Sequence, residues 1–273
     1  MTPDPSELYL LYADESNLEA RSGDFFVYAG LAFPSATAAQ LHSRVDQIRA
    51  NRRVPQDYVL KFNPGPDSHN HQDFIALKQD VLGAAAEAGV WLLVYVILHD
   101  CVEDRDPDIA RRFGINTVLY HFDCLLRLRE VDSHGIVLID RFSDRQLDGQ
   151  VRDLKNVGIR GLPYTPEHPL ERILGIHYSA IGQSPFASIT DVAIGSLRFA
   201  INAHTGSQPD PRDSRFPMLR QLQPMIPSDV GGRVHDVGFA MRPREVRSAR
   251  YRELYESLRL FLAEARIQLA PPR

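Results

Sequence analysis

The alternation of apolar and polar positions divides most of the chain into strands and helices. Apolar runs with the length and composition of strands buried on both faces occupy residues 8–13, 25–33, 90–98 and 135–139. Apolar residues recur at helical spacing within residues 35–53, 72–88, 107–129, 186–202 and 244–269. A last short strand is predicted at residues 172–178. The pattern therefore predicts an α/β protein whose sheet is covered by helices on both faces.

The connections indicate how the strands pair. A short polar stretch joins the first two strands, which predicts a hairpin with antiparallel arms. The helix at residues 107–129 links the strands at 90–98 and 135–139, and a right-handed crossover of this kind makes the two strands parallel. We expect the first strand to be central, with the second strand on one side and the strand ending at Asp140 on the other.

The last quarter of the chain reads differently. Residues 204–244 are rich in Pro, Gly, Asp and Arg with little periodicity, which predicts a long loop that is functional or disordered. We therefore expect a core at residues 1–203, and a loop plus C-terminal helix at 204–273 packed on the same domain. The aromatic stripe of that helix suits either the core or a subunit interface, so a homo-oligomer is one expected partner.

Composition narrows the functional classes only slightly. A net charge of -4 and a pI near 6.2 argue against a broadly basic nucleic-acid coat but leave room for a local basic groove. Two widely spaced cysteines predict no disulfide framework and fit a reducing cytoplasm. The N-terminus does not resemble a signal peptide, and no apolar run reaches the roughly 20 residues of a membrane span, so no membrane partner is expected.

Carboxylates stand where predicted core strands end. Asp14 and Glu15 follow the first strand, and Asp140 ends the strand that begins at Gly135. Neighbouring strands lie about 4.8 Å apart, so Asp14 and Asp140 would sit within reach of one ion. Two carboxylates about 4 Å apart repel by roughly 4 kcal/mol at an effective dielectric near 20, a cost that a divalent cation removes. Hard oxygen ligands favour Mg²⁺ or Mn²⁺, with Asp191 completing the set if its helix packs across that edge.

Such a site suits phosphodiester hydrolysis by two ions bridged through one carboxylate, for which Asp14 is the candidate. Adjacent strand residues point to opposite faces, so Glu15 ranks second to Asp14. For Asp191, the spacing from Ser188 also fits a capping box, in which the acid satisfies helix backbone donors. Lys61 is either a solvated loop charge or a phosphate contact. Arg198 lies on the same helix face as Asp191 and is either an ion-pair partner or a phosphate contact.

The ordered motifs resemble the DUF3800 family. The segments carrying the resemblance are Tyr12-Ala13-Asp14-Glu15-Ser16, Phe26-Val27-Tyr28-Ala29-Gly30, Leu138-Ile139-Asp140 and Ser188-Ile189-Thr190-Asp191-Val192-Ala193. The resemblance covers about residues 8–203. It implies an RNase H-like fold and a metal-dependent nuclease site, in which Asp14, Glu15, Asp140 and Asp191 match the family's acids. Ser188 and Thr190 stand where the family has Gln and Ala.

The resulting hypothesis is a hydrolase: a Mg²⁺- or Mn²⁺-dependent nuclease that cleaves DNA or RNA. The alternative is a catalytically weak or inactive relative that acts as a binding or regulatory subunit of a nucleic-acid-processing or phage-defence complex. A third hypothesis is another phosphate-directed metalloenzyme, such as a phosphatase. An ATPase, a helicase or a defence-system protein is the kind of partner that the resemblance implies.

Overall fold

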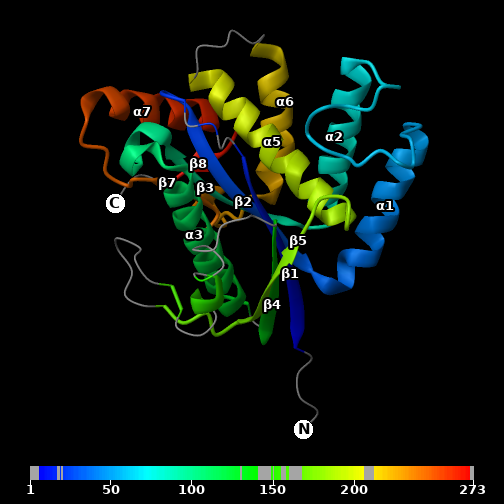
Figure 1. The fold of residues 1–273 in the computed structure, drawn as a ribbon, viewed down its shortest axis with the longest axis horizontal. Helices are drawn as coiled ribbons and strands as arrows, with labels where there is room; N and C mark the ends of the chain where they lie inside the picture. The colour runs from blue at the N-terminus through cyan, green and yellow to red at the C-terminus, as the bar shows by residue number, and fades with distance from the viewer. Residues whose placement is uncertain are drawn as a thin grey trace.

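The computed structural model describes residues 6–16, 19, 21–129, 131–140, 149, 151–154, 158–159, 168–205 and 212–270, with only the backbone of 212–215. Within these residues the main sheet has six strands in the order β5-β4-β1-β2-β3-β7 (Figure 1). The strands are β1 (Glu7–Ser16), β2 (Phe25–Pro34), β3 (Trp91–Leu98), β4 (Ser133–Asp140), β5 (Ile173–Ser179) and β7 (Phe239–Arg242). A second, two-stranded sheet pairs β6 (Arg233–Val234) with β8 (Gln268–Leu269).

The helices agree closely with the apolar periodicity. The α-helices are α1 (Ala38–Asn51), α2 (His71–Glu87), α3 (Pro107–Arg127), α5 (Pro185–Thr205), α6 (Arg212–Leu222) and α7 (Ala249–Glu264). Short 3-10 turns are η1 (Ser35–Thr37), η2 (His99–Cys101), η3 (Glu103–Arg105) and η4 (Gln223–Met225). Among the described helices, none combines the length and the apolar character needed to cross a membrane.

The strand directions define an RNase H-like mixed sheet with β1 at its centre. β1 pairs antiparallel with β2 and parallel with β4, while β2 pairs antiparallel with β3. β5 is parallel to β4, and β7 is parallel to β3. This confirms the predicted α/β fold and the central position of the first strand. It also means that β1, β3, β4 and β7 all point their C-terminal ends to the same edge of the sheet.

Helices cover both faces of the sheet, as the unbroken apolar strands predicted. One core cluster joins alternate strand residues to α1, α2, α5, α6 and α7, and the other joins the intervening residues to α3. All but the last residue of β2 is buried, because helices lie above and below it. The sheet is thus a rigid platform whose C-terminal edge holds the candidate residues.

The prediction of a long loop at residues 204–244 is wrong in its described part. α6 occupies residues 212–222, and β7 adds an outer strand next to β3. The short apolar run Phe239-Ala240-Met241 is buried there because β3 is apolar along its whole length and needs a covered edge. The C-terminal helical extension is also shorter than predicted, since α7 ends at Glu264 and β8 follows. Residues 206–211 lie outside the described part.

Candidate metal site at the sheet edge

Side-chain alternation along β1 separates the two neighbouring acids. Tyr12 belongs to the core cluster on the α5 face, whereas Leu11 and Ala13 belong to the cluster on the α3 face. By the same alternation Asp14 points to the α5 side and Glu15 to the α3 side. The strand has not turned at this point, because the pairing with β2 continues through Ser16. The two acids therefore face different surroundings.

Asp140 lies beside Asp14. Ala13 pairs with Ile139 in the parallel ladder between β1 and β4, so the next residues, 14 and 140, occupy neighbouring positions. Ile139 faces α3, which places Asp140 on the α5 side together with Asp14. On the far side of Asp140 the partner is Ser179 of β5. The predicted convergence of the two strand-end aspartates is thus present in the sheet register.

Asp191 approaches the same edge from α5, which packs across β1 and β2. Its Oδ2 accepts a hydrogen bond of 2.6 Å from the backbone N–H of Phe62. The capping-box interpretation is wrong, because α5 begins at Pro185 and Asp191 is its seventh residue. Ser184 instead accepts from the backbone N–H of Phe186 at the start of the helix. Asp191 is therefore held by the loop after α1.

A small pocket opens between these elements. Its lining combines the two strand ends with the start of α5, namely Tyr12, Ala13, Asp14, Leu138, Asp140, Ser179, Ile181, Ala187 and Thr190. Both strand-end aspartates thus border one recess.

The electrostatics of Asp14 are unfavourable for an isolated carboxylate. Burial raises its pKa well above the ordinary value, and the charges of Glu15, Asp140 and Asp191 raise the pKa further. Only one contact acts in the opposite direction, a hydrogen bond of 2.7 Å from the Glu15 backbone N–H to Asp14 Oδ1. A nearby cation would offset both the desolvation and the repulsion.

Glu15 has the counter-charge that Asp14 lacks. Its Oε1 lies 3.0 Å from Nε of Arg111 on α3, and both side chains are almost buried. Burial raises the pKa of Glu15, Arg111 opposes that shift, and Asp140 adds to it. Arg111 also contacts Asp108 at 2.8 Å. The ion pair with Arg111 makes Glu15 a support of the edge, with Asp14, Asp140 and Asp191 as the candidate ligands.

The donor set suits a hard divalent cation, since it consists of carboxylate oxygens. In the described part of the chain, no three His, Cys, Asp or Glu side chains are already arranged around one point as ligands. Asp14 and Asp140 are placed by the sheet, and Asp191 is turned toward Phe62. Binding an ion with all three would require a side-chain adjustment at Asp191.

The two predicted phosphate contacts lie near Asp191. Lys61 precedes Phe62, whose N–H binds the Asp191 carboxylate. Arg198 is mostly buried on α5, and burial lowers its pKa although Asp24, Asp191 and Glu19 act in the opposite direction. Its Nε is buried and makes no hydrogen bond with the residues that the structure describes.

Sequence reasoning missed the residues that hold this loop. Lys78 on α2 is buried with its Nζ 4.2 Å and 4.4 Å from the ring centres of Phe62 and Phe74, and it donates to the Phe62 carbonyl at 3.4 Å. Burial lowers the pKa of Lys78 to about 8. Gly195 makes room for Phe62, since a Cβ there would lie 2.3 Å from the ring. A lysine on an apolar helix face and a glycine inside an apolar helix were the available signals.

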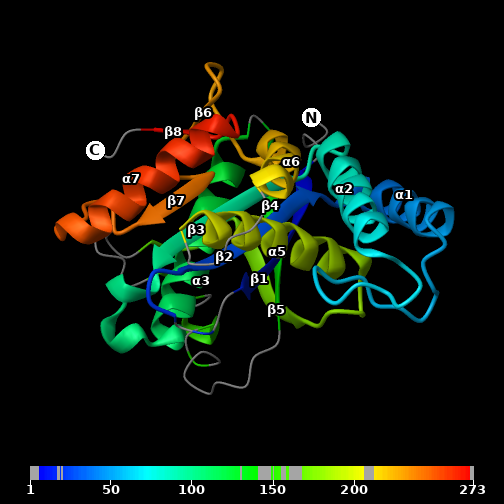
Figure 2. The same ribbon diagram turned by 90° about the horizontal axis from the view of Figure 1, so that it is seen from above.

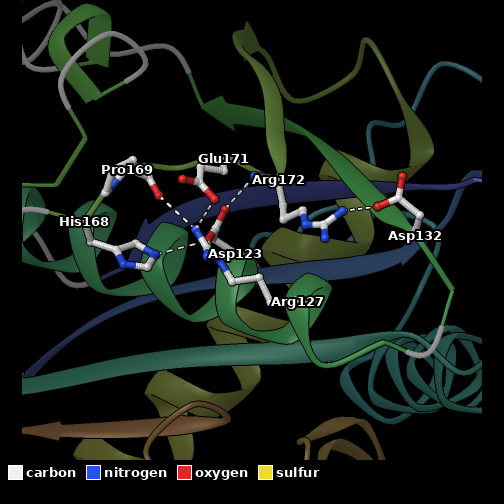
Figure 3. Close-up of polar contacts among 7 residues, drawn as sticks. All are labelled: Asp123, Arg127, Asp132, His168, Pro169, Glu171 and Arg172. Atoms are coloured by element: carbon white, nitrogen blue, oxygen red, sulfur yellow. Dashed lines mark hydrogen bonds and ion pairs between the residues drawn. The ribbon is translucent and has the colours of Figure 1, made fainter.

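The carboxylate of Asp123 on α3, which is not one of the candidate ligands, is fully paired (Figure 3). Asp123 on α3 has no exposed side-chain surface, and its Oδ2 lies 2.7 Å from Arg127 Nε and 3.0 Å from His168 Nε2. Its Oδ1 accepts from the backbone N–H of Arg172 at 2.9 Å. Arg172 in turn pairs with Asp132. Asp123 therefore ties α3 to the segment that enters β5.

Comparison with known proteins adds no family. No protein-family model matches the chain, and no curated protein is significantly similar to it. The resemblance to DUF3800 therefore depends on the ordered motifs alone.

Proposed function

We propose that this protein is a divalent-metal-dependent nuclease of the DUF3800 type. The observation that supports it best is the environment of Asp14: a half-buried carboxylate with a raised pKa, with other acids nearby, at the end of the central strand. A carboxylate whose pKa is raised by burial and by neighbouring acids is a candidate for a functional role. The fold is RNase H-like, and the edge involved is the one to which β1 and β4 both run.

In this proposal Asp14 bridges the metal, with Asp140 and Asp191 as further ligands. Mg²⁺ or Mn²⁺ would supply an activated water and stabilise the leaving oxygen of a phosphodiester. Phe62 holds Asp191 through its backbone N–H, and Lys78 holds Phe62 through its carbonyl. Arg198 offers its guanidinium charge to a phosphate oxygen, and Lys61 offers a second positive charge beside the same loop. The substrate is DNA or RNA.

The cellular setting that we propose is a reducing cytoplasm, which fits the free thiols of Cys101 and Cys124. An ATPase, a helicase or a defence-system protein remains the proposed class of partner, and a homo-oligomer stays a prediction. In the predicted stripe of α7, the side chains of Tyr255, Leu258 and Phe261 are buried. This burial supports the interpretation of the stripe as part of the core.

The test is to replace Asp14 and Asp140 singly with Asn and to measure cleavage of labelled DNA and RNA with Mn²⁺. Removing a direct ligand should cost more than the 10- to 100-fold typical of outer-shell changes, so we expect a loss above about 100-fold. Asp46→Asn on the exposed side of α1 is the control and should cleave normally. Wild-type rates in both site variants would refute the proposal.

Calorimetry with Mn²⁺ gives a readout that does not depend on cleavage. Wild-type protein should bind the ion, and Asp14→Asn should bind it much more weakly. The absence of binding in the millimolar range would instead favour a non-catalytic relative that binds nucleic acid or a protein partner. The observation favouring that second candidate is the orientation of Asp191, whose Oδ2 is already bonded to Phe62.

A further inference from the structure

The segment between β7 and the first turn of α7 concentrates positive charge on a chain that is acidic overall. Residues 242–252, here called the arginine segment, contain five arginines and one glutamate, whereas the whole chain has a net charge of -4. Most of these arginines are exposed to solvent. The positive charge is therefore a local feature of one surface.

Part of this charge is already used to build the segment. Arg242 makes a two-pronged ion pair with Asp236, with both contacts at 2.7 Å, and Arg244 pairs with the same carboxylate. Arg252 donates to the backbone carbonyls of Val246 and Arg247. These contacts fix the path of the backbone, which gives the remaining arginines a defined position.

Arg247 and Arg250 remain as exposed charges. Neither has a carboxylate partner within the described residues, and the guanidinium of Arg250 lies 5.9 Å from the ring centre of Tyr251. Two exposed arginines on a fixed backbone present their guanidinium groups to an external anion at a defined place.

The arginine segment lies at the same sheet edge as the carboxylates. Arg242 pairs with Ile97 in β3, and Ile97 pairs with Phe26 in β2, whereas Asp14 pairs with Ala29. Three strand spacings and three residues along the strand separate positions 14 and 242, which gives about 17 Å. Both views place the start of β2, the start of α3 and the connection from β7 to α7 together on one side (Figures 1 and 2).

Arg198 lies on the way from the carboxylates to the arginine segment. It follows Asp191 by two turns on α5, and α5 packs against both β1 and α7. One turn further along α5, Asn202 Oδ1 accepts a hydrogen bond of 2.8 Å from the backbone N–H of Phe25 at the start of β2. The guanidinium of Arg198 thus lies along this route.

We propose that the arginine segment, through Arg247 and Arg250, binds the phosphate backbone of a polynucleotide whose scissile bond lies at Asp14 and Asp140. This inference rests on the proposed nuclease function. A duplex rises about 3.4 Å per nucleotide, so the distance of about 17 Å between positions 14 and 242 corresponds to about five nucleotides of a duplex, and Arg247 and Arg250 follow position 242 in the chain. The substrate class is an extended nucleic acid, and mononucleotides or very short oligonucleotides cannot reach both regions. An acidic protein is less suitable, because the route leads directly to a site for phosphodiesters.

The binding experiment uses Asp14→Asn protein, so that nothing is cleaved. Arg247→Gln and Arg250→Gln are introduced together and compared with Arg233→Gln and Arg266→Gln. The control pair removes the same charge from exposed arginines beside β6 and β8, outside the arginine segment. Fluorescence anisotropy measures binding of a 30-nucleotide single strand and duplex across a salt series. Each lost phosphate contact lowers the slope of log K against log salt by about 0.7–0.9, so the first pair should lower it by about 1.5 and the control pair should not change it.

A length series sharpens the result. The Arg247/Arg250 double variant should bind a four-nucleotide strand as the parent does, and the long strand several-fold more weakly. Equal binding of the long strand by both double variants would overturn the inference. If polyglutamate competes with the long strand equally well at the same salt, and loses binding in the same variant, the surface belongs to an acidic protein and the inference is wrong.

The outcomes separate the two proposals. Suppose that wild type cleaves a long substrate and that the Arg247/Arg250 changes alter neither its cleavage nor its binding. The proposed docking surface is then wrong, and the proposed nuclease function stands. Binding that depends on these arginines in a protein that never cleaves removes the nuclease and leaves the surface.

Discussion

Two aspartates of this chain, Asp123 on α3 and Asp14 at the end of β1, have opposite surroundings. Asp123 has a guanidinium, an imidazole and a backbone N–H around its carboxylate, and its side chain is completely covered. Asp14 has one backbone N–H and three other carboxylates nearby. Asp123 lies on α3 and is fully covered, whereas Asp14 ends the central strand on the α5 side and is half-buried. They differ in the positive charge beside them. Arg127 and His168 lie next to Asp123, which ties α3 to the segment before β5.

The contrast teaches how to distinguish a supporting carboxylate from a reactive one. A buried charge must be paired or must bind something, because desolvation is otherwise costly. Asp123 meets the first condition within the chain. Among the described residues Asp14 has no such ion pair, and in the proposed function a bound cation would take that place. Glu15 lies between the two cases, since Arg111 neutralises it at the site itself.

The largest effect should come from breaking the paired region. Asp123→Asn leaves Arg127 and His168 without their shared anion, and loss of one partner in a buried pair costs about 3–5 kcal/mol. Guanidinium unfolding should show that loss, whereas Asp14→Asn should leave the free energy of unfolding unchanged or raise it. Equal destabilisation by the two variants would remove the distinction between the two aspartates.

A smaller effect should appear in the pH dependence of stability. Because the pKa of Asp14 is raised in the folded state, its contribution is fully present below its unfolded pKa near 4 and is lost as the pH rises through the folded pKa. Melting temperatures from pH 4 to 8 should therefore fall more steeply for wild type than for Asp14→Asn. Glu15 is present in both proteins, so the difference reports the removal of Asp14 together with its coupling to the neighbouring acids.

Adding Mn²⁺ at neutral pH should reverse that trend for wild type only, since metal binding requires the ionised carboxylate. Parallel pH curves for the two proteins would contradict the uncompensated environment of Asp14.

The smallest expected effect concerns a buried charge of the other sign. Lys78→Met keeps the chain of methylenes between Phe62 and Phe74 and removes the ammonium, which should raise the free energy of unfolding at pH 7 by about 1 kcal/mol. The folded pKa of about 8 is below the unfolded value near 10.4, so wild type gains stability as the pH rises between them. The advantage of the variant should shrink over that range, and Lys61→Met should show neither effect.

The core of the fold was predictable because its signals are local. Runs such as Leu8 to Ala13 can only be strands covered on both sides, and the hairpin and the crossover then fix the order around β1. The outer strand β7 was not predictable, since four residues in a Pro- and Arg-rich region give no periodic pattern. Its position depends on the bare edge of β3, which is a property of the folded sheet.

The candidate site was predictable to the same extent. Asp14 and Asp140 follow from strands that end together, and α5 brings Asp191 to the same side as expected. The contact between Asp191 and Phe62 joins residues 129 positions apart, so no local pattern could indicate it. The pairing of Glu15 with Arg111 was missed for the same reason, although the alternation along β1 had separated Glu15 from Asp14.

The late position of β7 in the chain has a consequence for biosynthesis. Strand β3 is apolar throughout, and its outer edge stays uncovered until residues 239–242 have been made. A nascent or truncated chain that stops before this point presents an open apolar edge to other chains, which is a route to aggregation. Shortening the protein from its C-terminus should thus yield insoluble material in place of a smaller working domain.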